Sequence, residues 1–220
     1  MLEFYYHPLS PIARRVWWTL LEKEIPFDPI IVDLRGKQFE PDFLTLSPFH
    51  HVPVLVHDNI RLIESLAILD YLDHQFPHNS LSSTAPVALA KMRMVQMVVT
   101  NEVIIHIVSV VNAENQLLTR EKKDHLETCF QFLEEQLGEK DYFGGDRLNL
   151  ADIVTGSTVP IFSRLGISLQ SYEALSRWQS RIVERPAWQQ TNPSEDDFQQ
   201  WKRWVQLQVK RHQRNRAKSA

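Results

Sequence analysis

Short apolar runs and amphipathic stretches alternate along the first part of the chain. Residues 2–6 form an apolar run rich in aromatics, which is typical of a buried strand. Residues 12–23 have helical spacing, with an apolar stripe of Val16, Trp17, Leu20 and Leu21. The remaining elements expected before residue 77 are a strand over 27–33, a short helix or turn over 38–46, strands over 52–57 and 61–63, and a helix over 64–76. This β-α-β-α-β-β-α order predicts an α/β unit with a mixed sheet.

Beyond residue 86 the period is helical throughout. Expected helices cover residues 87–111, 121–137, 149–165 with a kink at Pro160, 172–185, and 197 to about 210. The Ser- and Thr-containing stretch between Pro77 and Pro86 separates the two patterns. The pattern therefore predicts residues 1–78 as an α/β domain, 79–86 as a linker, and 87–220 as an all-helical domain with a basic tail.

Charge and hydropathy set limits on the partners. The 220 residues carry a net charge of −3, which does not suggest a nucleic-acid binder. Seven Lys and Arg follow Asp197, and we interpret them as a final helix with a solvated tail. The most apolar stretch, residues 94–111, contains Gln96, Asn101, Glu102 and His106, so we expect a buried helix and no membrane span.

The chain has a single cysteine, Cys129. It cannot form an intramolecular disulfide, and the first residues show no basic leader followed by a long apolar run. Both features favour a reducing, cytoplasmic setting. On a helix of the second domain, Cys129 is interpreted as an inert buried residue.

Short motifs occur along the chain in a specific order. Ser10-Pro11 follows the first strand, residues 48–55 read PFHHVPVL, residues 64–68 read ESLAI, and residues 149–152 read NLAD. Together they resemble the cytosolic glutathione transferase family, whose patterns are N-P-x-x-x-[VI]-P-x-L, E-S-x-A-I and [ST]-x-A-D. The opening, through Arg14-Arg15-Val16, is similar to the serine-type delta, theta and phi classes. The resemblance extends to roughly residue 190 and implies a thioredoxin-like first domain that binds glutathione.

The resemblance also implies roles for individual residues. Pro53 would follow a cis bond and turn the backbone of Val52 toward the cysteinyl part of glutathione, as an added strand pairs with a sheet edge. Glu64 would pair with the γ-glutamyl ammonium, and the helix N-terminus at Ser65 suits its carboxylate. The expected contacts to the glycyl end and the neighbouring backbone are Lys37, Gln38, His50 and His51. Ser47 replaces the family's usual Asn.

Ser10 is the candidate catalytic residue. The reaction needs the glutathione sulfur as a thiolate, and a free thiol is only a few per cent ionised at pH 7. A hydroxyl donor and a helix N-terminus both favour the anion, and Ser10 before Pro11 supplies both. A purely capping role is the alternative. Tyr6 is the runner-up donor, in the manner of the tyrosine-type classes.

For the second substrate we expect a pocket formed by Ile105, His106 and Ser109, with a lid between Trp201 and Trp204. Packing roles for these residues are the alternative, and His106 alone is more typical of a satisfied helix histidine. Asn149 and Asp152 predict a reciprocal helix cap. The adjacent His50 and His51 point to opposite faces of an extended chain, so no metal site is predicted there or elsewhere.

The resulting hypothesis is a cytoplasmic detoxification enzyme that joins glutathione, as co-substrate, to small hydrophobic electrophiles. One alternative is a binding module that kept the fold without the activity. Another is a different glutathione chemistry: peroxide reduction, dehalogenation or isomerisation. Family members are usually homodimers, and Phe49 occupies the position of an aromatic key inserted into the partner subunit.

Overall fold

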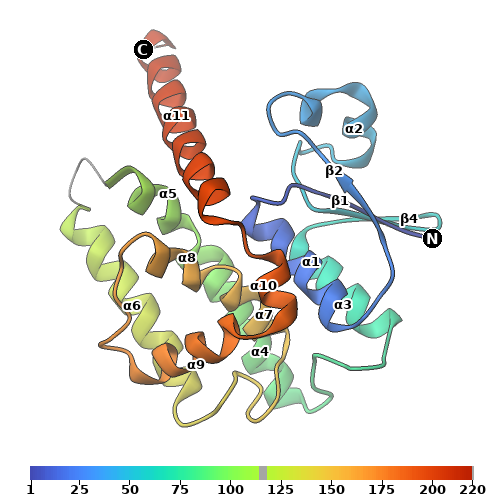
Figure 1. Ribbon diagram of the computed structural model, residues 1–220, viewed down its shortest axis with the longest axis vertical. Helices are drawn as coiled ribbons and strands as arrows, with labels where there is room; N and C mark the ends of the chain where they lie inside the picture. The colour runs from blue at the N-terminus through green and yellow to red at the C-terminus, as the bar shows by residue number, and fades with distance from the viewer. Residues whose placement is uncertain (114–117, 220) are drawn as a thin grey trace.

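The computed structural model describes residues 1–113 and 118–219, with the side chains of 211–219 left aside (Figure 1). The first domain contains β1(Leu2–Tyr6), α1(Pro11–Glu22), β2(Asp28–Ile31), η1(Lys37–Phe39), α2(Pro41–Leu46), β3(Val54–His57), β4(Ile60–Ile63) and α3(Ser65–Gln75). The strand order is β2-β1-β3-β4, with β1 and β2 parallel and the other pairs antiparallel. The predicted element order and mixed sheet are confirmed.

Helix α1 lies between the sheet domain and the helical domain, where it packs against α3, α7 and α10. Burial on two sides explains why Trp18 is inaccessible, whereas Trp17 and Leu21, expected in the buried stripe, are only half-buried. A single amphipathic stripe cannot describe a helix covered from both directions. Arg14 and Arg15 are buried for the same reason.

The second domain is entirely helical over its described residues. It contains α4(Pro86–Val98), the π-helical turn η2(Val99–Val103), α5(Ile105–Asn112), α6(Arg120–Leu137), α7(Leu150–Gly156), α8(Val159–Arg164), α9(Glu173–Val183), α10(Pro186–Thr191) and α11(Glu195–Ser219). Helix α11 extends along α5 and carries the C-terminus away from the sheet (Figure 1). Four of the basic residues expected in the tail, Arg211, Arg214, Arg216 and Lys218, have side chains outside the described set.

Two predicted helices are interrupted. The helix expected over 87–111 contains the π turn η2, and the helix expected over 149–165 is divided into α7 and α8 rather than kinked. Pro160 stands in the first turn of α8, where its missing N–H costs little. Helix α10, which begins at Pro186, was not expected, because Pro186 read as a stop signal.

The segment Pro86–Asn112 is long and apolar enough to cross a membrane by length and composition. One side of the segment is buried, with Met92, Val95, Val99 and Val103 in the core, and packs against α6 and α7. Apolar side chains on other sides, including Met97 and Ile105, are exposed. The helix expected to be buried is therefore buried only in part.

The predicted cap of α7 is confirmed. Asn149 Oδ1 accepts from the amides of Ala151 and Asp152, at 2.8 and 3.2 Å, and the Asp152 carboxylate accepts from the Asn149 amide. Asp152 also accepts from the Phe143 amide and from Trp178 Nε1 at 2.8 Å. Complete burial raises its pKa to about 6. Its role is structural, as the sequence indicated.

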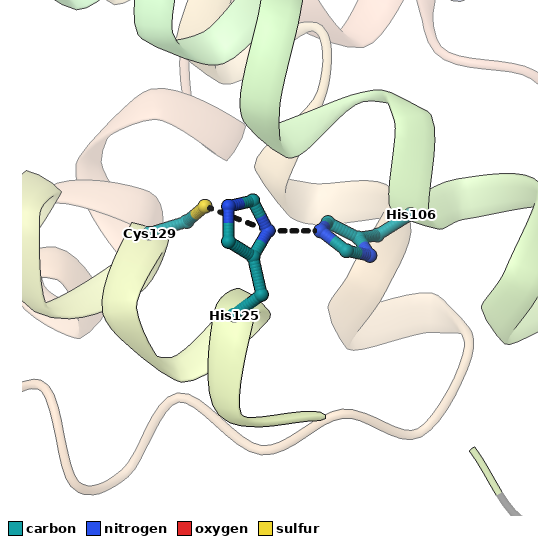
Figure 2. A group of neighbouring side chains, drawn as sticks. All are labelled: His106, His125 and Cys129. Carbon is teal, nitrogen blue, oxygen red and sulfur yellow. Dashed lines mark hydrogen bonds between the residues drawn. The ribbon is translucent and has the colours of Figure 1, made fainter. Parts of the chain in front are cut away.

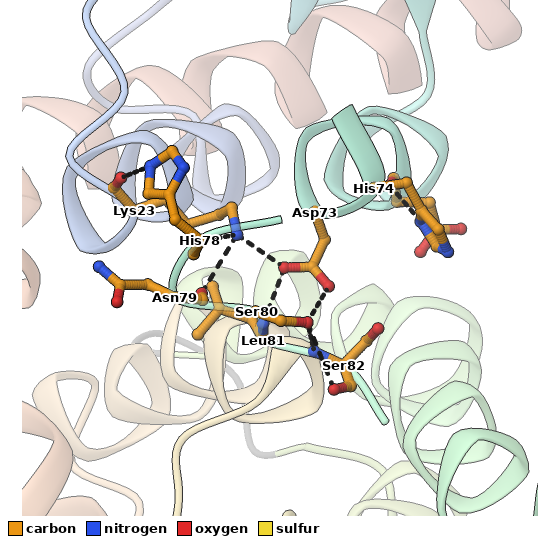
Figure 3. Close-up of polar contacts among 9 residues, drawn as sticks. Lys23, Asp73, His74, His78, Asn79, Ser80, Leu81 and Ser82 are labelled. Carbon is orange, nitrogen blue, oxygen red and sulfur yellow. Dashed lines mark hydrogen bonds and ion pairs between the residues drawn. The ribbon is translucent and has the colours of Figure 1, made fainter. Parts of the chain in front are cut away.

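A buried ion pair fixes the chain between the two domains (Figure 3). Lys23 Nζ lies 2.9 Å from Asp73 Oδ1 and donates to the carbonyls of His78 and Asn79. Asp73 in turn accepts from the Leu81 amide at 2.7 Å and from the Ser80 hydroxyl. The ends of α1 and α3 thereby hold the connecting segment against the core.

Candidate active site

The loop between β1 and α1 places Ser10 at the N-terminus of a 12-residue helix. Ser10 is the N-cap, its Oγ accepts from the Ala13 amide at 3.2 Å, and Pro11 occupies the first helical position. Accepting through a lone pair leaves the hydroxyl hydrogen available as a donor. The helix dipole adds partial positive charge at the same point, so the end of α1 is suited to an anion.

Residues 47–53 form the turn that leads into β3. The Val52-Pro53 peptide bond is cis, as the resemblance implied. Ser47 is buried, and its hydroxyl donates to the His51 carbonyl at 2.9 Å and accepts from the His51 amide at 3.1 Å. The serine that replaces the family's usual Asn therefore holds the backbone directly before Val52.

Glu64 and Ser65 join β4 to α3. Glu64 has φ 68° and ψ 112°, a strained backbone for a residue with a side chain. The α3 N-terminus follows at once, and Ser65 Oγ accepts from Arg15 Nη1 at 3.3 Å. Arg15 also donates to Thr100 Oγ1 at 3.0 Å, so one buried guanidinium connects α1 with α3 and the π turn.

A cavity of about 350 Å³ brings most of the predicted glutathione residues together. Its walls include Gln38, His50, His51, Val52, Pro53, Glu64 and Ser65. His50 Nδ1 is 3.2 Å from the Gln38 carbonyl, which links the two sides of this wall. The Gln38 amide group is engaged with its own loop, donating to the Leu34 carbonyl and accepting from the Gly36 amide.

A larger cavity of about 630 Å³ adjoins it. Its walls come from the β1–α1 loop, the strand end at Ile31, the α10–α11 connection and the first turns of α11. Three residues line both cavities: Ser10, Leu34 and Trp204. Sequence reasoning missed His7 and Asn192 as wall residues, because α10 was not expected and nothing in the local pattern marks either side chain. Burial lowers the pKa of His7.

Several predicted site residues lie elsewhere. Among the described residues that line the two cavities, Lys37, Ile105, His106 and Ser109 are absent. Ile105 is largely exposed, and Ser109 Oγ accepts from Lys122 Nζ. The expected lid residues Trp201 and Trp204 do face the larger cavity.

Tyr6 is likewise absent from the described walls of both cavities. It is buried, its ring is stacked on Phe4 with centroids 4.7 Å apart, and it contacts Trp17 on another side. Burial raises its pKa. This geometry favours Ser10 over Tyr6 as the hydroxyl that faces a ligand.

The protein combines a thioredoxin-like sheet and its cis-proline turn with a helical domain, and it has two adjoining cavities. This combination defines the class of protein. Residues 4–80 match the family model described as glutathione S-transferase, N-terminal domain, and residues 98–186 match the C-terminal domain of the same family. The chain belongs to the glutathione S-transferase family.

Named relatives agree with this assignment. Glutathione S-transferase U1 of Arabidopsis thaliana is 30% identical over 187 residues, covering 80% of this chain and 81% of the relative. Glutathione S-transferase U6 of the same plant is 29% identical over an equal span. A delta-class glutathione transferase of Nilaparvata lugens superposes with a TM-score of 0.82 at 23% identity, covering 94% of this chain and 99% of that one. Glutathione transferase F2 of Populus trichocarpa has a TM-score of 0.76 at 26% identity, covering 87% and 97%.

Proposed function

We propose that this protein conjugates the thiolate of glutathione to small hydrophobic electrophiles, with the Ser10 hydroxyl donating a hydrogen bond to the sulfur. One observation carries the proposal: Ser10 lines both cavities. Glutathione in the smaller cavity would place its sulfur at Ser10, and the larger cavity would hold the second substrate on the other side. The reacting atoms would then meet at the N-terminus of α1.

The chemistry follows from the charge that must be stabilised. Ionised sulfur is the nucleophile, and a donor that binds the anion more strongly than the thiol lowers the pKa of the thiol. Because the bond from the Ala13 amide fixes the Ser10 oxygen, little reorganisation is needed when the thiolate forms. The conjugated product retains no sulfur charge, so this hydrogen bond weakens as the reaction proceeds.

The smaller cavity offers groups for the rest of glutathione. Val52 would pair its backbone with the cysteinyl unit, and Glu64 with the N-terminus at Ser65 would take the charged γ-glutamyl end. His50, His51, Pro53 and Gln38 would shape the glycyl side. Lys37, the chain neighbour of the wall residue Gln38, would act only through its charge.

The larger cavity indicates an apolar second substrate. Trp17, Trp201 and Trp204 provide aromatic walls. Polar side chains also line the cavity, among them His7, Arg35, Asn192 and Asp197. We propose these residues, in place of Ile105, His106 and Ser109, as the electrophile site. A role in detoxification, a cytoplasmic location and a homodimer with Phe49 at its interface complete the proposal.

The deciding experiment measures conjugation of 1-chloro-2,4-dinitrobenzene and of an isothiocyanate by the wild type and by Ser10→Ala and Ser10→Thr. We expect kcat/KM to fall by about 100-fold in Ser10→Ala, the usual effect of losing one preorganised donor. Ser10→Thr, which keeps a hydroxyl, should retain more activity. In Ser10→Ala the pKa of the bound thiol should return toward about 8.5, moving the pH–rate profile upward.

Tyr6→Phe, with Tyr5→Phe as its matched control, tests the runner-up donor and should leave activity unchanged. Glutathione affinity measured by calorimetry separates lost binding from lost chemistry. Full activity of Ser10→Ala would contradict the role of Ser10. Neither glutathione binding nor conjugation in the wild type would point to a binding module, and turnover of an organic hydroperoxide alone would point to a peroxidase.

A further inference from the structure

Three ligand-type side chains converge in the helical domain, away from both cavities (Figure 2). His106 projects from α5, and His125 and Cys129 project from the same face of α6, four residues apart. His106 Nε2 lies 2.7 Å from His125 Nδ1, and Cys129 Sγ lies 4.0 Å from the same nitrogen. One atom from each residue falls within 4.8 Å of the others.

The surroundings orient these atoms. The Glu102 carboxylate lies 3.4 Å from His125 Nε2, the ring nitrogen that does not contact His106. Cys129 Sγ donates toward the Glu102 main-chain carbonyl at 3.7 Å. Glu102 belongs to the π turn η2, and such turns are frequent at functional sites because they re-aim side chains and carbonyls.

We propose that His106, His125 and Cys129 bind a divalent transition metal ion, with Zn²⁺ the favoured ion and Glu102 holding His125 in the ligating tautomer. Two imidazoles and a thiolate are a donor set that zinc accepts. A carboxylate on the distal nitrogen of a ligating histidine is the arrangement found behind many such sites. This inference does not depend on the proposed transferase chemistry.

The two imidazoles need only a small adjustment to share one ion. About 3.3 Å separates two nitrogens bound to the same tetrahedral zinc, given Zn–N bonds of about 2.0 Å. The ring nitrogens of His106 and His125 are closer than this, because one proton now lies between them. The metal would take the place of that proton, and the proton would move to Nδ1 of His106.

The protonation states of His106 and Cys129 determine which protons are released when the metal binds. Burial, the neighbouring His125 and Lys122 lower the pKa of His106. Burial and Glu102 raise the pKa of the Cys129 thiol to about 11. The thiol proton therefore leaves for solvent when the sulfur binds, and apparent affinity should rise with pH.

The site has both an entry path and an open position. His106 and Cys129 are buried, whereas the His125 side chain is 43% exposed and gives access from solvent. Three protein ligands leave a fourth position of a tetrahedral ion for water or a further ligand. Because the ligands come from α5 and α6, the bound ion would cross-link these helices.

Cobalt provides a direct test, since Co²⁺ occupies zinc sites and its absorption reports a thiolate ligand. Full-length protein, stripped of metal and kept reduced without glutathione, is titrated with Co²⁺. We expect one equivalent to produce a thiolate-to-cobalt charge-transfer band and the visible bands of a tetrahedral ion, both removed by Zn²⁺. Zn²⁺ should also raise the Tm of the wild type.

Variants assign the ligands. Cys129→Ser should abolish the charge-transfer band, His106→Gln should weaken Co²⁺ binding more than tenfold, and Glu102→Gln should weaken it by about tenfold. His74→Gln, at an exposed histidine on α3, is the matched control and should bind as the wild type does. Circular dichroism confirms that each variant is folded. Absence of the charge-transfer band in the wild type, or equal affinity in wild type and His106→Gln, overturns the proposal.

Discussion

Arg15 is unfavourable for stability but supports a residue of the candidate site. It is fully buried, and among the described residues its Nε and Nη2 find no hydrogen-bond partner. Burial lowers its pKa to about 10, which means that the folded protein disfavours the charge. The guanidinium nevertheless bonds the hydroxyl of Ser65, which lies at the wall of the smaller cavity. Burying its charge therefore opposes folding, whereas its hydrogen bond positions Ser65 at the cavity wall.

We expect Arg15→Met to bind glutathione more weakly without losing stability. Replacing an uncompensated buried charge by an apolar side chain of similar length should leave the free energy of unfolding within about 1 kcal/mol. Loss of one positioning hydrogen bond, about 1.4 kcal/mol, corresponds to a KM for glutathione about tenfold higher.

Steady-state kinetics and urea denaturation measure the two effects in Arg15→Met. The neighbouring Arg14 is also buried but bonds Thr191 and the Trp188 carbonyl, so Arg14→Met is the control and should leave this KM unchanged. An unchanged KM in Arg15→Met would show that Ser65 needs no support from α1.

The family resemblance predicted the smaller cavity better than the larger one. Gln38, His50–Pro53, Glu64 and Ser65 were placed together by the family's motifs, and they do line one cavity. Ile105, His106 and Ser109 were placed by assuming an unbroken helix over 87–111. The π turn and the path of α11 depend on tertiary packing, which a single sequence does not reveal.

At the scale of elements, the contact between α1, α7 and α9 is set by a glycine. A Cβ added at Gly156 would lie 2.8 Å from Trp18 Cζ3 and 2.9 Å from Ile182 Cγ2. Both neighbours are fully buried and have little freedom to move. Gly156 therefore determines how closely α7 approaches the helix that carries Ser10.

Gly156→Ala should lower stability by about 1–2 kcal/mol, since the overpacking penalty exceeds the helix-propensity gain of alanine. For a chain of this size the Tm should fall by about 2–8 °C in differential scanning calorimetry. Gly36→Ala, where an added Cβ meets nothing within 4 Å, is the matched control and should not destabilise. Equal Tm values for the two variants would mean that α7 shifts freely away from α1.

Element boundaries were predictable where a cap marked them. Ser10-Pro11 and Asn149 define the starts of α1 and α7 to within one residue, because their side chains bond the first free amides. The break between α7 and α8 carries no such mark. There the hydroxyls of Ser157 and Thr158 donate to carbonyls four residues back, an alternative that the pattern of apolar residues does not encode.

At the scale of the whole molecule, the Lys23–Asp73 pair of the first domain anchors the segment that leads to the second domain. The Lys23 side chain is fully buried and that of Asp73 is 2% exposed. Burial alone would raise the pKa of Asp73, but hydrogen bonds from the Leu81 amide and from Lys23 lower it overall. A depressed carboxyl pKa contributes stability above the unfolded value, and that contribution is lost as pH falls through the folded value.

Asp73→Asn should therefore destabilise the protein by about 3–5 kcal/mol at neutral pH, and by progressively less below about pH 4. Urea unfolding of wild type and variant across this range measures the difference. Asp70→Asn, on the same helix but partly exposed, should show a much smaller loss. A difference between wild type and Asp73→Asn that stays constant with pH would contradict the ionised state of Asp73.

Assembly is the other property of the whole molecule. Phe49 is 58% exposed in the single chain and stands beside the smaller cavity. If it is inserted into a partner subunit, Phe49→Ser should raise the dimer dissociation constant at least tenfold, the equivalent of exposing about half a phenylalanine side chain. Sedimentation velocity measures this, with the equally exposed Phe39 as control in Phe39→Ser. A wild-type monomer, or a Phe49→Ser dimer of unchanged affinity, would remove Phe49 from the interface.

The two cavities share residues near Ser10 but differ in the rest of their walls. The one with the glutathione motifs takes its walls mainly from residues 34–65, whereas the other draws on residues 7–35 and 190–204. Substitutions over residues 190–204 can therefore reshape the larger cavity while leaving most walls of the smaller one untouched. Among the described residues of that late segment, only Trp204 lines both cavities. Trp204 is thus the position at which a change made to one compartment is transmitted to the other.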